Sequence, residues 1–240
     1  MTSDLHVRSQ RPPALREIIA LSLACLAYSV LSFLAKAPES VAVAHAHDVA
    51  AFESRIGVFI EGSANTWLSA HSLLASLASA QYAVSFFAMT SFALVALWRK
   101  APAHYRRARW TLVIMTIGAL ITYWTYPLAP PRLVPDLGFV DAVAAHTSAY
   151  SHLFGTMPSM HTGWSVWVAV MLGTYVWRSW WARLILALHP AITIVTIVAT
   201  ANHYVVDAIG GCVYFLLAWL CVTILNRALL GNVRTTGETS

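Results

Sequence analysis

Six apolar stretches of nearly membrane-spanning length constrain this chain more than any other feature of its sequence. A helix needs about 20 mostly apolar residues to cross the hydrocarbon layer of a bilayer. An even number of such helices also places both ends of the chain on one side of the membrane. The sequence therefore predicts an all-α, polytopic membrane protein, a six-transmembrane-helix bundle over approximately residues 17–35, 74–98, 110–128, 163–177, 184–200 and 204–226.

The composition agrees with a membrane environment. Of the 240 residues, 58% are hydrophobic and only 10% are charged, and the mean hydropathy is +0.64. Ordinary water-soluble domains of this size do not show such a profile. The basic residues lie in short clusters between apolar stretches, as topology signals do, so we expect no nucleic acid partner. We expect one membrane-embedded domain over residues 1–240.

The distribution of Lys and Arg predicts the orientation in the membrane. With six spans, all but three of the 15 Lys and Arg residues fall on the side of the termini; Lys36, Arg55 and Arg132 fall on the other. Positively charged loops remain in the cytoplasm. Both termini are therefore expected to be cytoplasmic, and the loop that carries Arg132 is expected to face outward. The first apolar stretch follows arginines as a secretory signal does, but it is long for a signal core, so we expect it to remain uncleaved.

The segment over about residues 47–70 alternates charged and apolar residues at helical spacing. It is too polar to span a membrane. We expect an amphipathic, interfacial helix after the first span, lying on the outer surface with its apolar face in the lipid boundary. A partly buried lid would give the same pattern, so that alternative stays open.

An acidic residue inside the last apolar stretch is the first candidate for chemistry. Asp207 is costly to place there, which favours a paired or functional role. His203 lies four residues earlier, so in a helix the two side chains share one face and can form a hydrogen bond. Such a pair fixes the tautomer of the imidazole and leaves its second nitrogen as a nucleophile or base. Taken alone, the spacing more often marks a structural hydrogen bond near a helix end.

Two further elements lie near the ends of other spans. Pro158 and Ser159 suit a turn that starts the fourth span, whose free N–H groups favour a phosphate. His161 then lies in the first turn, where it can protonate a leaving alkoxide or serve only as a surface residue. Arg132 follows two prolines, and its guanidinium matches two phosphate oxygens, although such an arginine is often merely solvated. All three elements fall on one predicted side, and together they predict a phosphoryl-transfer site.

Three short motifs carry a resemblance to a known family. Pro130-Pro131-Arg132, Pro158-Ser159-Met160-His161 and His203-Tyr204-Val205-Val206-Asp207 occur in this order on six expected spans. In this order they resemble the type 2 phosphatidic acid phosphatase superfamily. The sequence is more narrowly similar to its inositol phosphorylceramide synthase-like branch, over about residues 47–226.

The resemblance implies a role for each residue of the motifs. His203 is the nucleophile that takes up the phosphoryl group, and Asp207 orients it. His161 protonates the leaving group, and Arg132 holds phosphate oxygens. Ser159 assists in the same pocket through its hydroxyl or its backbone N–H.

The sequence departs from the superfamily at two phosphate-binding positions. Thr125 stands where the wider family has a Lys, and Ile197 stands where it has an Arg. The loss of both cations fits the synthase-like branch better than the phosphatases. Helix N-termini or His152 are the candidates that replace them.

The expected function is that of a lipid phosphate phosphatase or phospholipid head-group phosphotransferase, working through a phosphohistidine without a cofactor or metal. A lipid phosphate drawn from the membrane lipids is the substrate, and water, a polyol or another alcohol accepts the phosphoryl group. Two alternatives stay open. One is a membrane metalloenzyme with His152, His161, His203 and Asp207 as ligands, although the sequence lacks HxxxH or HExxH spacing. The other is a small proton-coupled transporter, although the polar residues gather at one membrane face.

Overall fold

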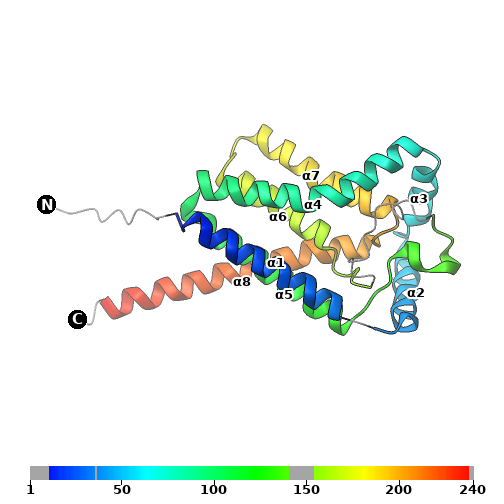
Figure 1. Ribbon diagram of the computed structural model, residues 1–240, viewed down its shortest axis with the longest axis horizontal. Coiled ribbons are helices and arrows are strands. Elements are labelled where there is room, and N and C mark those ends of the chain that lie inside the picture. The colour runs from blue at the N-terminus through cyan, green and yellow to red at the C-terminus, as the bar shows by residue number, and fades with distance from the viewer. Residues whose placement is uncertain (1–10, 36, 141–153, 238–240) are drawn as a thin grey trace.

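A computed structural model describes residues 11–35, 37–140 and 154–237 of the chain, with side chains described as far as residue 228. Six helices run along the long axis of the molecule, and α1 begins at the same end at which α8 finishes (Figure 1). Each of the six corresponds to one of the apolar stretches: α1 (Ala14–Leu34), α4 (Ser72–Lys100), α5 (Pro102–Thr125), α6 (Met160–Tyr175), α7 (Trp180–Ala199) and α8 (Val205–Gly237).

Among the described residues, four helices are long and apolar enough to cross a membrane: α1, α4, α7 and the part of α8 over Val205–Ala228. The helices α5 and α6 fall short for different reasons. Arg106, Arg107 and Arg109 occupy the first turns of α5 and lower its hydropathy. The 16 residues of α6 extend only about 24 Å at 1.5 Å per residue, which is less than the hydrocarbon thickness of about 30 Å.

The helix α6 lies at the centre of the bundle, where it contacts α4, α5, α7 and α8. Trp167 and Leu172 of α6 have no exposed surface. The indole N–H of Trp167 donates to the carbonyl oxygen of Ala108 on α5 at 2.9 Å. A buried indole needs such a partner, so this contact fixes α6 against α5. Other helices therefore surround α6, and most of its surface meets protein.

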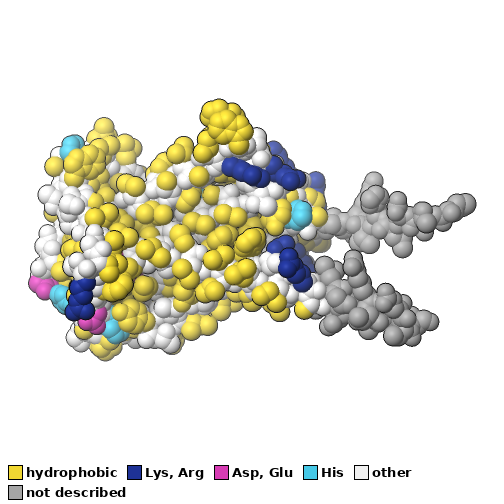
Figure 2. Space-filling model, turned by 180° about the vertical axis from the view of Figure 1, so that it is seen from behind, with side chains coloured by type: hydrophobic (Ala, Val, Ile, Leu, Met, Phe, Trp, Pro, Cys, Tyr) yellow, Lys and Arg dark blue, Asp and Glu magenta, His cyan; other side chains and the backbone are white. Residues whose placement is uncertain are grey.

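Hydrophobic side chains cover the middle of the molecule on the face seen in Figure 2. On that face most Lys and Arg side chains gather at the end where α1 begins, and the visible acidic side chains lie at the other end. Large apolar side chains on α1, α4, α7 and α8 are exposed along their length. This surface suits a lipid environment, because an exposed apolar band of such extent is not stable in water.

Two further helices, α2 (Glu39–Ile56) and α3 (Glu61–Ser69), lie at the end of the bundle opposite the start of α1 (Figure 1). The single helix expected over residues 47–70 is therefore wrong. Gly57 ends α2 in the left-handed conformation, with φ 73°, and its N–H bonds back to α2. Glycine adopts this conformation at no steric cost, so the chain turns here and starts a second helix.

One face of α2 packs against the rest of the protein. This packing agrees better with the partly buried lid than with a helix whose apolar face lies in lipid. Ala42 and Ala46 are fully buried on that face, while Phe52 and Ile56 on the other face are about half exposed. The carbonyl of Ala42 accepts a hydrogen bond from the N–H of Ala129 at 3.1 Å. The helix α2 therefore braces the loop that follows α5.

Candidate active site

His203 and Asp207 lie together at the start of α8. The Nδ1 atom of His203 lies 3.4 Å from Oδ2 of Asp207, and both side chains are buried. The expected helical relationship is wrong, because His203 lies in the turn before α8, which begins at Val205. The contact forms because Oδ2 of Asp207 also accepts the N–H of Tyr204 at 2.9 Å, so the carboxylate reaches back over the helix start as in one half of a capping box.

His161 lies in the first turn of α6, as expected, and its ring faces that of His203. The two ring centroids are 5.7 Å apart with an angle of 61° between the planes. Two aromatic residues of α4 contact the ring of His161. The ring of Tyr82 stacks on it with a centroid distance of 4.3 Å, and the centroid of the Phe86 ring lies 4.7 Å away. Two aromatic rings thus hold the imidazole of His161 in place beside His203.

Arg132 lies in a short 3-10 turn, η1 (Pro131–Leu133), that approaches the turn before α8. Its Nε donates to Oδ1 of Asn202 at 2.9 Å, and its backbone N–H donates to the carbonyl of Ala201 at 3.0 Å. Asn202 precedes His203 directly, so the guanidinium is attached to the same turn as the imidazole. The amide of Asn202 is itself fixed by a 2.8 Å hydrogen bond from its Nδ2 to Oγ1 of Thr200.

The turn that carries Asn202 and His203 is held in an unusual conformation. Ala201 has φ 53°, and it is fully buried. A residue with a Cβ in this left-handed region costs roughly 1–2 kcal/mol. The hydrogen bond from Arg132 to the carbonyl of Ala201 holds the turn, so the surrounding packing maintains a geometry that the backbone alone disfavours.

Ser159 joins the start of α6 to the start of α8. Its Oγ accepts the N–H of Thr162 at 3.3 Å and caps α6, and its own N–H donates to the carbonyl of Asp207 at 2.9 Å. The side chain is fully buried. The phosphate contact expected of Ser159 stays a prediction, and its backbone N–H already has an acceptor within the protein.

Close packing of α6 and α8 depends on Gly211. A methyl group at this position would overlap the carbonyl oxygen of Ser159 and would lie 2.9 Å from the backbone nitrogen of Gly163. Glycine is therefore required where the two helix starts cross, since only a residue without a side chain permits this approach. Gly211 thereby keeps His161 near His203.

Two carboxylates from the segment over residues 47–70, Glu53 and Glu61, lie fully buried at the same place. Oε1 of Glu53 accepts the N–H of Val206 at 2.7 Å, and Oε1 of Glu61 accepts the N–H of Val205 at 2.8 Å. With Asp207, three carboxylates occupy the first N–H groups of α8. Burial, with the neighbouring Glu61 carboxyl as the next cause, raises the pKa of Glu53 from 4.5 to about 8, so Glu53 keeps its proton at neutral pH.

Three further positions were singled out in the sequence: His152, Thr125 and Ile197. His152 lies outside the described residues, so neither its phosphate contact nor the four-ligand metal alternative is placed. Thr125 is exposed and bonds to the carbonyl of Ile121 in its own helix. Ile197 is fully buried, and its carbonyl accepts the N–H of His203.

Sequence reasoning missed the residues that position the three expected groups: Tyr82, Phe86, Asn202, Glu53 and Glu61. Only Asn202 had a signal in the sequence, as the polar neighbour of His203 at the start of an apolar stretch. The aromatic residues of α4 cannot be told from other lipid-facing rings by their spacing. The two glutamates bond to backbone groups about 150 residues away, which no local pattern reveals.

The family model described as the PAP2 superfamily matches residues 47–221, which is more than half of the chain and contains all three motifs. No curated protein and no solved structure gives a significant match. The chain therefore belongs to the PAP2 superfamily, whose members are phosphatases and phosphotransferases that act on lipid-like phosphates.

Proposed function

We propose that this protein is a lipid phosphate phosphatase or phospholipid head-group phosphotransferase that works through a phosphohistidine at His203. The observation that carries the proposal is the approach of two imidazoles, with ring centroids 5.7 Å apart, one of them paired with a buried carboxylate. A nucleophilic nitrogen about 3 Å from phosphorus and an acid about 3 Å from the leaving oxygen fit this separation around a single phosphate.

In the first step Nε2 of His203 attacks phosphorus. The carboxylate of Asp207 faces Nδ1 of His203 and favours the tautomer with the proton on Nδ1. In that tautomer Nε2 has the free electron pair. The bond between phosphorus and the lipid oxygen breaks in line with the attack, and protonated His161 gives its proton to that oxygen. The products are a lipid alcohol and a phosphoryl group bonded to His203.

In the second step an acceptor hydroxyl attacks the same phosphorus. His161, now neutral, takes the proton of the acceptor, and the electron pair of the nitrogen–phosphorus bond returns to His203. Water as the acceptor yields free phosphate, whereas a polyol or another alcohol yields a new phosphate ester. The loss of two cations, which Thr125 and Ile197 replace here, fits the inositol phosphorylceramide synthase-like branch better than the phosphatases, and this supports transfer.

Arg132 is the group that supports phosphate binding best. Its Nε is held by Asn202, one residue from the nucleophile, so the guanidinium can share the charge on the equatorial oxygens. We assign the site to the outer face of the membrane, with six spans and both termini in the cytoplasm. The gathering of Lys and Arg at the end where α1 begins supports this orientation (Figure 2).

Trapping the covalent intermediate tests the proposal. Protein is incubated with lipid phosphates labelled with radioactive phosphorus, quenched in alkali and separated by electrophoresis. We expect label that survives alkali and is lost in acid, as a phosphoramidate bond requires, and no label on His203→Ala. His71→Ala is a matched control, because His71 is exposed and bonds only locally to Trp67. Turnover retained by His203→Ala would exclude the mechanism.

The products of the same reaction separate hydrolysis from transfer. With candidate polyols present, a new labelled lipid identifies a transferase, and free phosphate as the only labelled product identifies a phosphatase. A panel that includes phosphatidate, a polyprenyl phosphate and a phosphoinositide identifies the donor.

A further inference from the structure

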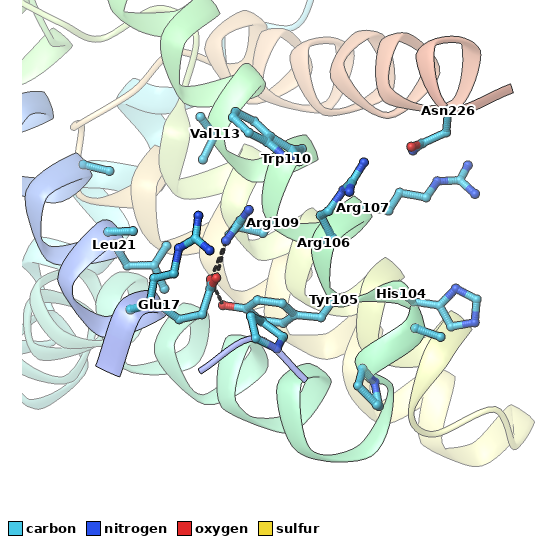
Figure 3. A pocket seen from close by; sticks show the side chains of 16 residues that line it. Glu17, Leu21, His104, Tyr105, Arg106, Arg107, Arg109, Trp110, Val113 and Asn226 are labelled. Carbon is cyan, nitrogen blue, oxygen red and sulfur yellow. Dashed lines mark hydrogen bonds and ion pairs between the residues drawn. The ribbon is translucent and has the colours of Figure 1, made fainter. Parts of the chain in front are cut away.

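Figure 3 shows a cavity of about 1130 Å³. It lies at the end of the bundle opposite His203, since Asn226 borders it and His203 precedes the start of α8. It is formed between the starts of α1 and α5 and is bordered by Asn226 of α8. Among the described residues, four arginines and one acidic residue line it: Arg16, Arg106, Arg107, Arg109 and Glu17. The lining therefore carries an excess of positive charge at the end of the bundle that the charge bias assigns to the cytoplasm.

Glu17, the one acid among the described residues that line the cavity, is already paired. Oε1 of Glu17 lies 2.5 Å from Nη1 of Arg109, and the hydroxyl of Tyr105 donates to Oε2 of Glu17 at 3.0 Å, as the dashed lines in Figure 3 mark. Glu17 is 6% exposed. It thus neutralises one guanidinium, and among the described residues no other carboxylate pairs with the remaining three arginines that line the cavity.

One of those arginines has an unsatisfied donor. Arg107 donates through Nη2 to the hydroxyl of Thr223, but its Nε is buried and has no hydrogen-bond partner among the described residues. A buried N–H of a charged group without an acceptor is costly. Arg107 also lines the cavity, where an anionic ligand would share the charge of its guanidinium.

The deeper part of the cavity is apolar. Ala20, Leu21 and Ala24 follow the basic residues on α1, and Trp110 and Val113 follow them on α5. Moving from the end of the bundle toward its middle, both helices therefore change from cationic to apolar. A soluble anion would make no use of the apolar part, whereas an amphiphile with an anionic head fits both parts.

We propose that this cavity binds one anionic phospholipid, with its phosphate on Arg16, Arg106 and Arg107 and an acyl chain along the apolar part between α1 and α5. Basic pockets between membrane helices on the cytoplasmic side recognise such head groups. The helix α1 is exposed over most of its surface and makes its main helix contact with α5. The lipid therefore adds a second attachment for α1, at a site separate from the catalytic residues.

Native mass spectrometry of the full chain tests the binding. Delipidated protein in neutral detergent is titrated with phosphatidylglycerol or with phosphatidylcholine. We expect one phosphatidylglycerol per chain at saturation and weaker binding of phosphatidylcholine. The double variant Arg16→Gln, Arg106→Gln should bind phosphatidylglycerol at least about tenfold more weakly, with lipid phosphate turnover unchanged, because neither residue contacts the catalytic site.

Two controls decide between this site and less specific binding. Arg178→Gln removes a charge from an exposed arginine at the same end that does not line the cavity, and it should change the affinity less than about twofold. Ala20→Trp fills the apolar part without changing any charge and should also weaken binding. An equal loss with Arg178→Gln, or unchanged affinity in the double variant, would overturn the proposal. So would displacement by inorganic phosphate at the concentration at which the lipid itself binds, since the ligand would then be a soluble anion.

Discussion

Asp207 presents one carboxylate oxygen both to Nδ1 of His203, at 3.4 Å, and to the backbone N–H of Tyr204, at 2.9 Å. One atom therefore orients the imidazole and fixes the start of α8. Asp207→Asn separates these two functions, because the amide oxygen can still accept from Tyr204 while the charge that orients His203 is lost. We expect turnover of lipid phosphate to fall on the order of 10²- to 10⁴-fold, with little change in the midpoint of thermal unfolding in detergent. A large drop in that midpoint would instead make Asp207 chiefly structural.

The role of His161 as acid depends on the leaving group. His161→Ala should slow the release of an alkoxide by about 10²- to 10⁴-fold, but it should slow the release of nitrophenolate much less, because that anion leaves without a proton. The comparison is made by measuring kcat for a lipid phosphate and for a nitrophenyl phosphate ester with the same variant. Equal losses for both esters would contradict the assignment.

Arg132 should act through the geometry of its guanidinium and not through charge alone. Arg132→Lys keeps the charge but loses the planar fork and the hydrogen bond to Asn202. We expect kcat/KM to fall roughly 10- to 100-fold, from the loss of one or two charge-assisted hydrogen bonds. Asn202→Ala should produce a smaller loss in the same direction. Steady-state kinetics of both variants measure these effects, and a wild-type value for Arg132→Lys would remove Arg132 from the phosphate site.

Gly211→Ala should damage both stability and activity. The added methyl group overlaps the carbonyl of Ser159, so α6 and α8 must separate and His161 must move from His203. Overpacking of this kind costs at least about 1–3 kcal/mol, which thermal unfolding in detergent detects. Gly62→Ala is the matched control, because nothing lies within 4 Å of the added group. It should be neutral or stabilising by up to about 1 kcal/mol.

Glu53 should make stability depend on pH. Its pKa rises from 4.5 in an ordinary environment to about 8 in the folded protein, so the folded state binds the proton more tightly between these values. Stability from this group is therefore full below about pH 4.5, falls as the pH rises through this window, and is lost above about pH 8. Glu53→Gln, which mimics the protonated form, should flatten the unfolding midpoint across the window. Glu39→Gln, at an exposed position of α2, should leave the pH dependence of the unfolding midpoint as it is in the wild type.

The parts of the fold that depend on local hydropathy were predictable from the sequence. All six apolar stretches are helical, because an apolar stretch of that length in lipid satisfies its backbone only by forming a helix. The division into α2 and α3 was not predicted, since it depends on the positive φ of Gly57, and an isolated glycine within a helical pattern is usually tolerated.

The catalytic candidates were predicted more fully than the residues that hold them. The approach of His161 to His203 was expected from the motifs, and Asp207 was correctly paired with His203 although the expected helical relation was wrong. Glu53 and Glu61 fall in the segment over residues 47–70, which was expected to form one amphipathic helix on the outer surface or a partly buried lid. Their burial is set by the N–H groups of Val205 and Val206, and the hydropathy of residues 47–70 contains no information about that distant helix start.

The first backbone N–H groups of α8 donate hydrogen bonds to the carboxylates of Glu53, Glu61 and Asp207. This affects product release at the end of the catalytic cycle. A helix N-terminus with free N–H groups binds anions, but the N–H groups of α8 are already bonded to carboxylates and do not bind the phosphate product. Inorganic phosphate should therefore dissociate rapidly and be only a weak product inhibitor.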